Sequence, residues 1–276
     1  MGLEIDGAIS AHYAMGVERD RLTTWGRLEA ARTRELLARY LPSAPADVLD
    51  VGGANGVYAL PLARAGYRVR LLDPMPMHVE AARAGSRRQP EHPLAGAEVG
   101  DARALPYPDA SADAVLLFGP LYHLVDAEDR QRALGECRRV LRPGGRLLAA
   151  AISRFASAMD GVRSGFLNQP GFERMVLGVL RDGVHRNPDP VGRPDWFTLA
   201  YFHRPEELRD ELVAAEFTDV TVHAVEGIGA LGPDAATALD DPVRRETLLR
   251  TIRRLESEPA VLGASPHLLA AALRGS

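Results

Sequence analysis

The chain contains no lysine, and all 33 of its basic residues are arginine. Without a lysine amine, no Schiff base with a carbonyl substrate or with pyridoxal phosphate can form, and a phosphate-binding P-loop would lack its lysine. Cysteine is scarce as well, because Cys137 is the single one in 276 residues. This excludes an internal disulfide and a metal site built from several thiolates. Cys137 lies in a helical pattern that favours a core position, and we predict no metal site.

Long apolar runs and an excess of basic residues are also missing. No apolar stretch approaches the roughly twenty residues that cross a bilayer, and no secretion signal is recognisable, so we expect a soluble, cytoplasmic protein without a membrane partner. The net charge of −4 argues against a nucleic-acid partner, which would require a broad basic face. The hydrophobic share of 46% is that of an ordinary globular protein.

A glycine-rich turn lies within the stretch from Val48 to Leu62. Val48 to Val51 predicts a buried parallel strand, and Val57 to Ala65 repeats apolar residues at helical spacing. Glycine permits the backbone angles that a strand-to-helix turn needs and lets a ligand approach the main chain. The free N–H groups of the following helix favour a negatively charged ligand group. The stretch therefore predicts a nucleotide-type site.

The spacing of small residues distinguishes among such sites. A dinucleotide fingerprint would have its third glycine at Val57, and a P-loop would have a lysine there, after Gly56. The pattern that fits is Asp50-x-Gly52-x-Ala54-x-Gly56. It resembles the first motif of the class I S-adenosylmethionine (SAM) methyltransferases, with Ala54 in place of the usual middle glycine.

The resemblance implies how this motif binds its ligand. In that family the glycine turn, which here includes Gly53, lies against the methionine part of SAM. The acid that precedes the turn, here Asp50, steadies it and contacts the amino group of SAM.

Two more acids follow later predicted strands. A second strand ends at Asp73, followed by Pro74, and a doubly wound fold places an acid there to accept both ribose hydroxyls. A third strand is followed by Asp101 and Ala102. This resembles the family's acidic motif, whose aspartate accepts the exocyclic amine of adenine.

We predict an α/β fold: a doubly wound, Rossmann-like, mostly parallel sheet, as in class I methyltransferases, with an N-terminal helical lid and a helical cap insertion. The last strand is expected at Thr221 to Val225, with helices at Glu246–Ser257 and Pro266–Leu273 packed on the domain. The expected division is a lid at 1–45, the SAM-binding core at 46–152, a cap over the substrate site at 153–204, and the rest of the core with a helical tail at 205–276.

The segment after the predicted fourth strand lies at the carboxyl edge of the sheet, where open α/β folds bind ligands. Phe118 and Gly119 end that strand and, by the resemblance, contact the cofactor. Tyr122 and His123 follow, and in the resembling enzymes this segment lies beside the methyl group and the substrate. A neutral imidazole can accept a proton near neutral pH. His123 alternatively caps the next helix.

The lid and the cap supply further candidates. The first twenty residues are polar and irregular, and a helical pattern then runs to Pro42. This segment resembles the lid of small-molecule methyltransferases, in which side chains reach over SAM, so Tyr13 and Arg32 are candidates for that contact. In the cap, Tyr201 and His203 belong to an aromatic cluster that either lines a substrate pocket or packs the cap onto the core.

The resemblance implies a SAM-dependent methyltransferase that produces S-adenosyl-L-homocysteine. We expect it to methylate an O, N or C nucleophile of a small organic molecule in secondary metabolism. The catalytic candidates are Tyr122, His123, Tyr201 and His203, and position alone does not separate the two histidines. Three alternatives stay open: a cyclase or lyase that uses SAM, a SAM-binding regulator without catalysis, and a nicotinamide oxidoreductase.

Overall fold

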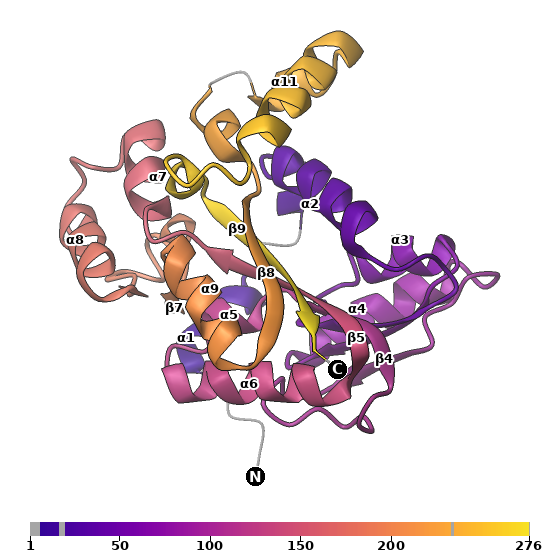
Figure 1. Ribbon diagram of the computed structural model, residues 1–276. Helices are drawn as coiled ribbons and strands as arrows, with labels where there is room; N and C mark the ends of the chain where they lie inside the picture. Colours follow the sequence, from indigo (N-terminus) through magenta and orange to yellow (C-terminus); the bar gives the residue numbers. More distant parts are fainter. Residues whose placement is uncertain (1–5, 17–19, 233–234, 276) are drawn as a thin grey trace.

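The computed structural model describes residues 6–16, 20–232 and 235–275. Its core is a seven-stranded sheet with the order β3-β2-β1-β4-β5-β9-β8 (Figure 1). β1 to β5 run parallel, whereas β9 runs antiparallel to both of its neighbours. The strands are β1 Asp47–Val51, β2 Arg68–Asp73, β3 Gly96–Val99, β4 Ala112–Leu117, β5 Leu141–Ile152, β8 Phe217–Ala224 and β9 His267–Arg274. This confirms the predicted mostly parallel, Rossmann-like sheet.

Helices cover both faces of the sheet. One face packs against α2, α3 and α4, and the other packs against α6 and α9, because each helix turns an apolar stripe toward the strands. The helices that precede β5 are α1 Gly7–Ala14, α2 Arg27–Tyr40, α3 Ala59–Arg64, α4 Pro76–Arg87, α5 Pro120–His123 and α6 Ala127–Val140. Those that follow β5 are α7 Ala156–Ser164, α8 Phe172–Asp182, α9 Pro205–Ala214, α10 Ala235–Ala238 and α11 Pro242–Leu255.

The prediction for the carboxyl-terminal segment is wrong. Residues 266–273 were expected to form a helix, but β9 is a strand that lies between β5 and β8. Its residues 268–272 are buried. Alanine and leucine favour a helix, but pairing with two strands satisfies the backbone and buries the run on both faces. The edge strand β8 is therefore not the last strand, although it covers most of the predicted range.

The insertion after β5, predicted to be helical, contains the helices α7 and α8. It also holds a short antiparallel pair, β6 Val184–His185 and β7 Ala200–Tyr201, and a 3₁₀ turn, η2 Pro194–Trp196. At the other end of the chain, residues 7–14 form α1, whereas irregular structure was expected there. A second 3₁₀ turn, η1 Arg21–Thr23, precedes α2.

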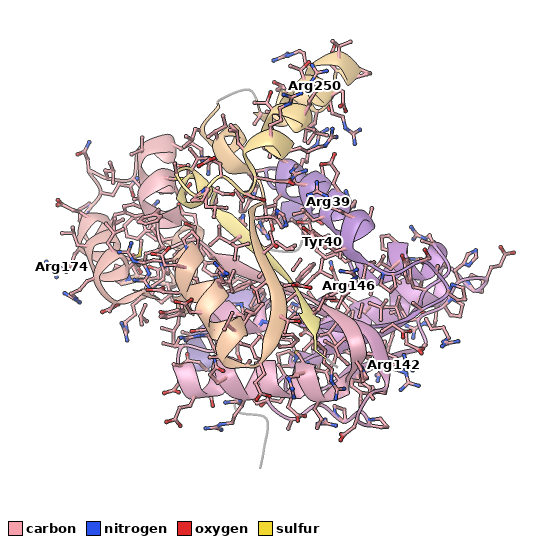
Figure 2. All side chains as sticks on the ribbon, in the orientation of Figure 1. Arg39, Tyr40, Arg142, Arg146, Arg174 and Arg250 are labelled. Atoms are coloured by element: carbon pink, nitrogen blue, oxygen red, sulfur yellow. The ribbon has the colours of Figure 1, made fainter. Side chains whose placement is uncertain are left out.

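Arginine supplies all basic side chains on the surface, such as Arg174 on α8 and Arg250 on α11 (Figure 2). The protruding α11 confirms the predicted helix near residues 246–257 (Figure 1). Over residues 6–16, 20–232 and 235–275, no helix combines the length and the apolar composition that crossing a membrane requires.

Candidate functional site

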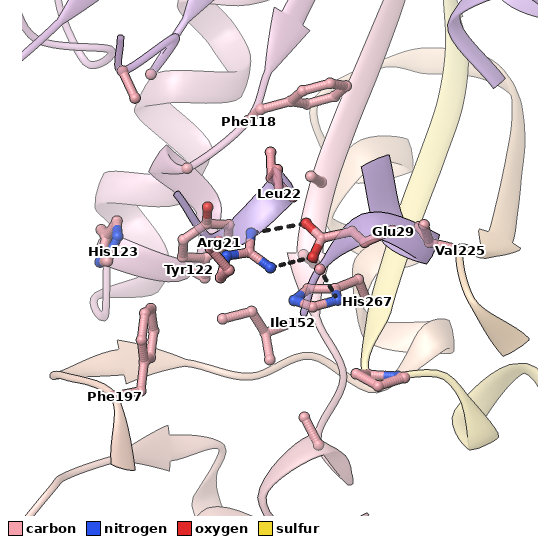
Figure 3. Close-up of a pocket in the computed structure, with 18 of the residues that line it drawn as sticks. Arg21, Leu22, Glu29, Phe118, Tyr122, His123, Ile152, Phe197, Val225 and His267 are labelled. Atoms are coloured by element: carbon pink, nitrogen blue, oxygen red, sulfur yellow. Dashed lines mark hydrogen bonds and ion pairs between the residues drawn. The ribbon is translucent and has the colours of Figure 1, made fainter. Parts of the chain in front are cut away.

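A cavity of about 1590 Å³ opens at the carboxyl edge of the parallel strands. The ends of β1, β2, β4 and β5 form its floor, and residues of the lid and the cap form its walls. Leu22 of the lid and Phe197 of the cap are labelled in Figure 3. Pockets for one small ligand typically measure about 300–1,000 Å³. The cavity therefore has room for two organic molecules side by side. It lies where the strand order reverses between β1 and β4, which is the expected ligand position in such a sheet.

The glycine turn brings main chain to the cavity surface. Gly52 has a φ of +81°, and a Cβ there would lie 2.6 Å from the carbonyl oxygen of Phe118. At Gly53, a Cβ would lie 2.7 Å from the carboxylate of Asp50. Ala54 adopts a left-handed φ of +46°, which is unfavourable for a residue with a side chain. Its N–H donates a hydrogen bond of 2.9 Å to Asp73, which offsets that strain.

Asp50 carries a buried carboxylate at the floor of the cavity. Among the described residues, neither of its oxygens has a hydrogen-bond partner of normal geometry. Burial, together with the nearby charge of Asp73, raises the pKa of Asp50 to about 7, and the backbone N–H of Ala59 offsets this only in part. An orphaned carboxylate is costly to bury, so the site favours a ligand with a cationic group at this point.

The other two predicted acids also border the cavity. Asp73 accepts hydrogen bonds of 2.9 Å from the N–H groups of Ala54 and Met75. Asp101 forms an ion pair of 2.7 Å with Arg103. Burial would raise the pKa of Asp101, but the hydrogen bonds and charge of Arg103 outweigh it and hold that pKa below its ordinary value. Both carboxylates are thus oriented before a ligand binds.

Residues 49–149 match the family model described as Methyltransferase domain. A protein named uncharacterized methyltransferase from Mycobacterium bovis is 31% identical over 236 residues, which cover 82% of this chain and 79% of that protein. The chain belongs to the SAM-dependent methyltransferases. A ubiquinone biosynthesis O-methyltransferase of Methylocella silvestris is 31% identical over 178 residues, 62% of this chain and 57% of that protein.

Solved structures show the same fold. One of them is geranyl diphosphate C-methyltransferase from Streptomyces coelicolor A3(2), crystallised with Mg²⁺, geranyl diphosphate and S-adenosyl-L-homocysteine. Its TM-score is 0.56 at 15% sequence identity, over 93% of this chain and 83% of that one. At this identity, the likeness shows the fold alone.

The residues around the glycine turn of this methyltransferase fit SAM. The orphaned carboxylate of Asp50 suits the ammonium group of the cofactor, and the absence of side chains at Gly52 and Gly53 leaves the main chain open to close approach. All but one of the predicted cofactor residues border the cavity. They are Tyr13, Asp50, Gly52, Gly53, Ala54, Gly56, Asp73, Pro74, Asp101, Ala102, Phe118 and Gly119.

The exception is Arg32, and its position corrects the expectation that it reaches over the cofactor. Its guanidinium is fully buried, donates a 3.1 Å hydrogen bond to the carbonyl of Val225, and forms ion pairs with Glu35 and Glu256. Arg32 therefore joins α2 to the end of β8. Tyr13, by contrast, lies in the cavity wall, with its hydroxyl 2.7 Å from Nε2 of His123.

The four catalytic candidates fall into two groups. Tyr122 and His123 border the cavity, as Figure 3 shows. Tyr201 and His203 do not. The ring of Tyr201 lies 3.8 Å beneath the guanidinium of Arg130, and His203 is fully buried. Burial lowers the pKa of that histidine, which corrects its assignment as a base of the pocket.

The extended backbone near β7 explains this separation. Side chains alternate between the two sides of such a segment, so Tyr201 and His203 point to one side while Phe202 points to the other. Phe202 borders the cavity together with Trp196 and Phe197. The aromatic cluster thus lines the pocket and also packs the cap onto the core, through different members.

The sequence did not predict a polar group on the cavity wall, which is made of Arg21, Glu29, Glu226 and His267. Glu226 follows β8, and His267 is the first residue of β9. Since β9 was predicted as an outer helix, no pattern placed its first residue at the ligand edge. The one available signal was the strand at Thr221 to Val225, whose carboxyl end points Glu226 toward that edge.

Proposed function

We propose that this methyltransferase acts on a small organic molecule with a largely apolar body, bound between the cofactor loops and the cap. The observation that carries the proposal is the size of the cavity, about 1590 Å³, which exceeds what a single cofactor needs. Ile152, Phe197 and Val225 give its walls an apolar character (Figure 3). A net charge of −4 also disfavours nucleic acid as the acceptor.

The names of two similar proteins support this substrate class. The relative from Methylocella silvestris is named for ubiquinone biosynthesis, and the structure from Streptomyces coelicolor contains geranyl diphosphate. Both names refer to small molecules with apolar carbon skeletons. A role in secondary metabolism stays a prediction.

When bound, SAM supplies an electrophilic methyl group on a positively charged sulfonium. The residues of the chain would position the cofactor and keep water away from the acceptor. Asp73 would hold the ribose hydroxyls, Asp101 the adenine amine and Asp50 the ammonium group, while Tyr13 covers the site from the lid. The cap at 153–204 and the described part of the lid would exclude water from the acceptor. Alignment of the acceptor with the methyl group lowers the barrier by several kcal/mol, roughly.

The cofactor site can be tested by calorimetry with S-adenosyl-L-homocysteine. Asp73→Ala and Asp101→Ala should each weaken binding by roughly tenfold to a hundredfold, because hydrogen bonds to a charged group contribute about 1.5–3 kcal/mol. Asp109→Ala is the matched control, since this exposed acid pairs with Arg139 outside the cavity. Tight binding of NAD without binding of S-adenosyl-L-homocysteine would end the proposal.

The acceptor can be sought with SAM labelled in its methyl group and a panel of phenols, quinols, carboxylic acids and amines. Label transferred to one class of acceptor supports the proposal. Consumption of SAM with label in no acceptor would instead support the cyclase or lyase alternative. Binding without turnover of SAM would support the regulator.

A further inference from the structure

Four charged side chains from separate segments meet on the cavity wall. Arg21 comes from η1, Glu29 from α2 and His267 from the start of β9 (Figure 3), and Glu226 follows β8. Arg21 holds both oxygens of the Glu29 carboxylate. Nδ1 of His267 lies 2.6 Å from Glu226 and 3.5 Å from Glu29. Both carboxylates thus face the same ring nitrogen, Nδ1.

Glu226 is fixed by the backbone around it. Its buried carboxylate accepts a hydrogen bond from the N–H of His267 at 3.2 Å and lies 3.0 Å from the hydroxyl of Ser265. That serine is itself fully buried, and its hydroxyl accepts hydrogen bonds of 3.1 Å from the N–H groups of Glu226 and Gly227. A carboxylate held in this way sets the orientation of the imidazole that it contacts.

The contact with Glu226 also sets the tautomer of His267. A carboxylate beside Nδ1 retains the proton on that nitrogen, which leaves the lone pair on Nε2. In Figure 3 the second ring nitrogen lies on the side toward Arg21 and Ile152, and these three residues border the cavity. His267 is paired with Ile152, the last residue of β5, so the imidazole stands at the carboxyl edge of the sheet.

We propose that Nε2 of His267 is the base that accepts the proton of the methyl acceptor, that Glu226 positions this base, and that the carboxylates of Glu226 and Glu29 stabilise the resulting imidazolium. The acceptor class that fits is an apolar molecule with an ionisable hydroxyl, such as a phenol or an enol. This inference rests on the proposed function, because it needs an acceptor in the cavity.

The step balances in atoms and charge. The O–H bond of the acceptor breaks, and its proton moves to Nε2 of His267. The oxygen electron pair forms the bond to the methyl carbon while the carbon–sulfur bond breaks, with the sulfur keeping that bond's electrons. The positive charge of the sulfonium is thus replaced by that of the imidazolium. The proton leaves to solvent when the product departs.

The charges around the imidazole suit this role. Burial alone would lower the pKa of His267, but the charges of Glu226 and Glu29 outweigh both burial and the opposing charge of Arg21, and they raise that pKa. Glu29, Glu226 and His267 are also close enough to share a cation, with ligand atoms within 4.8 Å of one another. The guanidinium of Arg21, which holds both oxygens of Glu29, disfavours a metal ion there.

His123 serves this role less well. Its Nε2 already lies 2.7 Å from the hydroxyl of Tyr13.

The first test needs no acceptor. In the full chain with ¹⁵N-labelled histidine, NMR should show neutral His267 protonated on Nδ1, with a pKa above the ordinary value of about 6.5. His267→Gln identifies the signal, and Glu226→Gln should lower that pKa because one neighbouring charge is gone. A neutral ring protonated on Nε2, or a pKa that Glu226→Gln leaves unchanged, would overturn the proposal.

The second test uses the best acceptor from the labelled-methyl panel. His267→Gln and His267→Asn should lower turnover by ~10²–10⁴ while binding of S-adenosyl-L-homocysteine stays nearly unchanged. His92→Gln, a change at an exposed histidine, is the control. In the wild type, activity should rise with pH around the pKa found by NMR. In Glu226→Gln, this rise should occur at a lower pH.

The outcomes separate the two proposals. Wild-type turnover in both His267 variants, or an acidic limb that Glu226→Gln does not move, overturns the role of His267 and leaves the methyltransferase intact. Failure of the wild type to bind S-adenosyl-L-homocysteine overturns the proposed function. If no acceptor in the panel takes the label, the NMR titration decides the assignment of the base.

Discussion

The hydroxyl of Tyr13 lies 2.7 Å from Nε2 of His123, although 110 residues separate the two in sequence. This contact joins helix α1 of the lid to the segment that follows β4. The ring of Tyr13 also meets His78 edge-on at 5.2 Å, and His78 lies 3.0 Å from the carboxylate of Asp73. The lid thus contacts the segment that includes Asp73, the residue proposed to hold the ribose.

Tyr13→Phe should therefore weaken binding of S-adenosyl-L-homocysteine by roughly twofold to tenfold, because one hydrogen bond contributes about 0.5–1.5 kcal/mol and the ring remains. Calorimetry measures this directly. Tyr67→Phe is the control, since the Tyr67 hydroxyl donates to the carbonyl of Pro42 and does not border the cavity. Equal affinity of the Tyr13 variant and the wild type would show that the lid does not cover the cofactor.

The first half of the site was predictable from sequence because its signals are local. The apolar run of β1, the glycine turn and the acid at the end of β2 each depend on a few consecutive residues, and parallel strands place their carboxyl ends together. The spacing of Asp50 and Gly52 therefore predicted that both residues lie at the carboxyl edge of the sheet. The structure brings all these residues to one cavity.

The second half was not predictable, because β9 depends on distant partners. Residues 268–273 read Leu-Leu-Ala-Ala-Ala-Leu, which favours a helix by intrinsic propensity. Pairing with β5, more than a hundred residues earlier, and with β8 overrides that preference. Missing the strand meant missing His267 and its carboxylate neighbours. The same lack of long-range information placed Arg32 and His203 at the pocket.

The glycine turn offers a test of close packing. Gly52→Ala should destabilise the protein by several kcal/mol, roughly, because its Cβ would lie 2.6 Å from both the Phe118 carbonyl and Pro120. Gly144→Ala is the control for backbone strain alone. The φ of Gly144 is +76°, but a Cβ there meets nothing within 4 Å. This variant should therefore lose only about 1–2 kcal/mol of unfolding free energy. If urea unfolding shows that both variants lose the same unfolding free energy, close packing at Gly52 is not the cause of its loss.

His203 provides a test of the corrected pocket. It is fully buried, and its Nε2 lies 3.2 Å from Glu211. His203→Ala should lower the free energy of unfolding by about 2–4 kcal/mol, through a cavity and a lost hydrogen bond. Turnover of the folded variant should remain close to the wild type. A large fall in turnover with unchanged thermal stability would instead show that His203 takes part in catalysis.

Asp50 predicts a dependence of stability on pH in the absence of cofactor. Its pKa is about 7 in the folded protein and about 3.9 in an unfolded chain. Between these values the folded state binds the extra proton, so this group's contribution to stability falls as pH rises and is fully lost above about pH 7. Asp50→Asn removes the titration. In urea unfolding, the stability of the variant relative to the wild type should rise between about pH 4 and pH 7 and level off above that.

Cofactor binding should reverse the effect of that substitution. An ammonium group beside Asp50 favours the ionised carboxylate, so binding of S-adenosyl-L-homocysteine below about pH 7 releases a proton. The affinity of the wild type should rise with pH up to about 7 and then level off, whereas the affinity of Asp50→Asn should be weaker and should lack this rise. Calorimetry in buffers of different ionisation enthalpy measures the released proton. Parallel pH profiles for the two proteins would mean that Asp50 is not the partner of the ammonium group, and its orphaned carboxylate would then need another explanation.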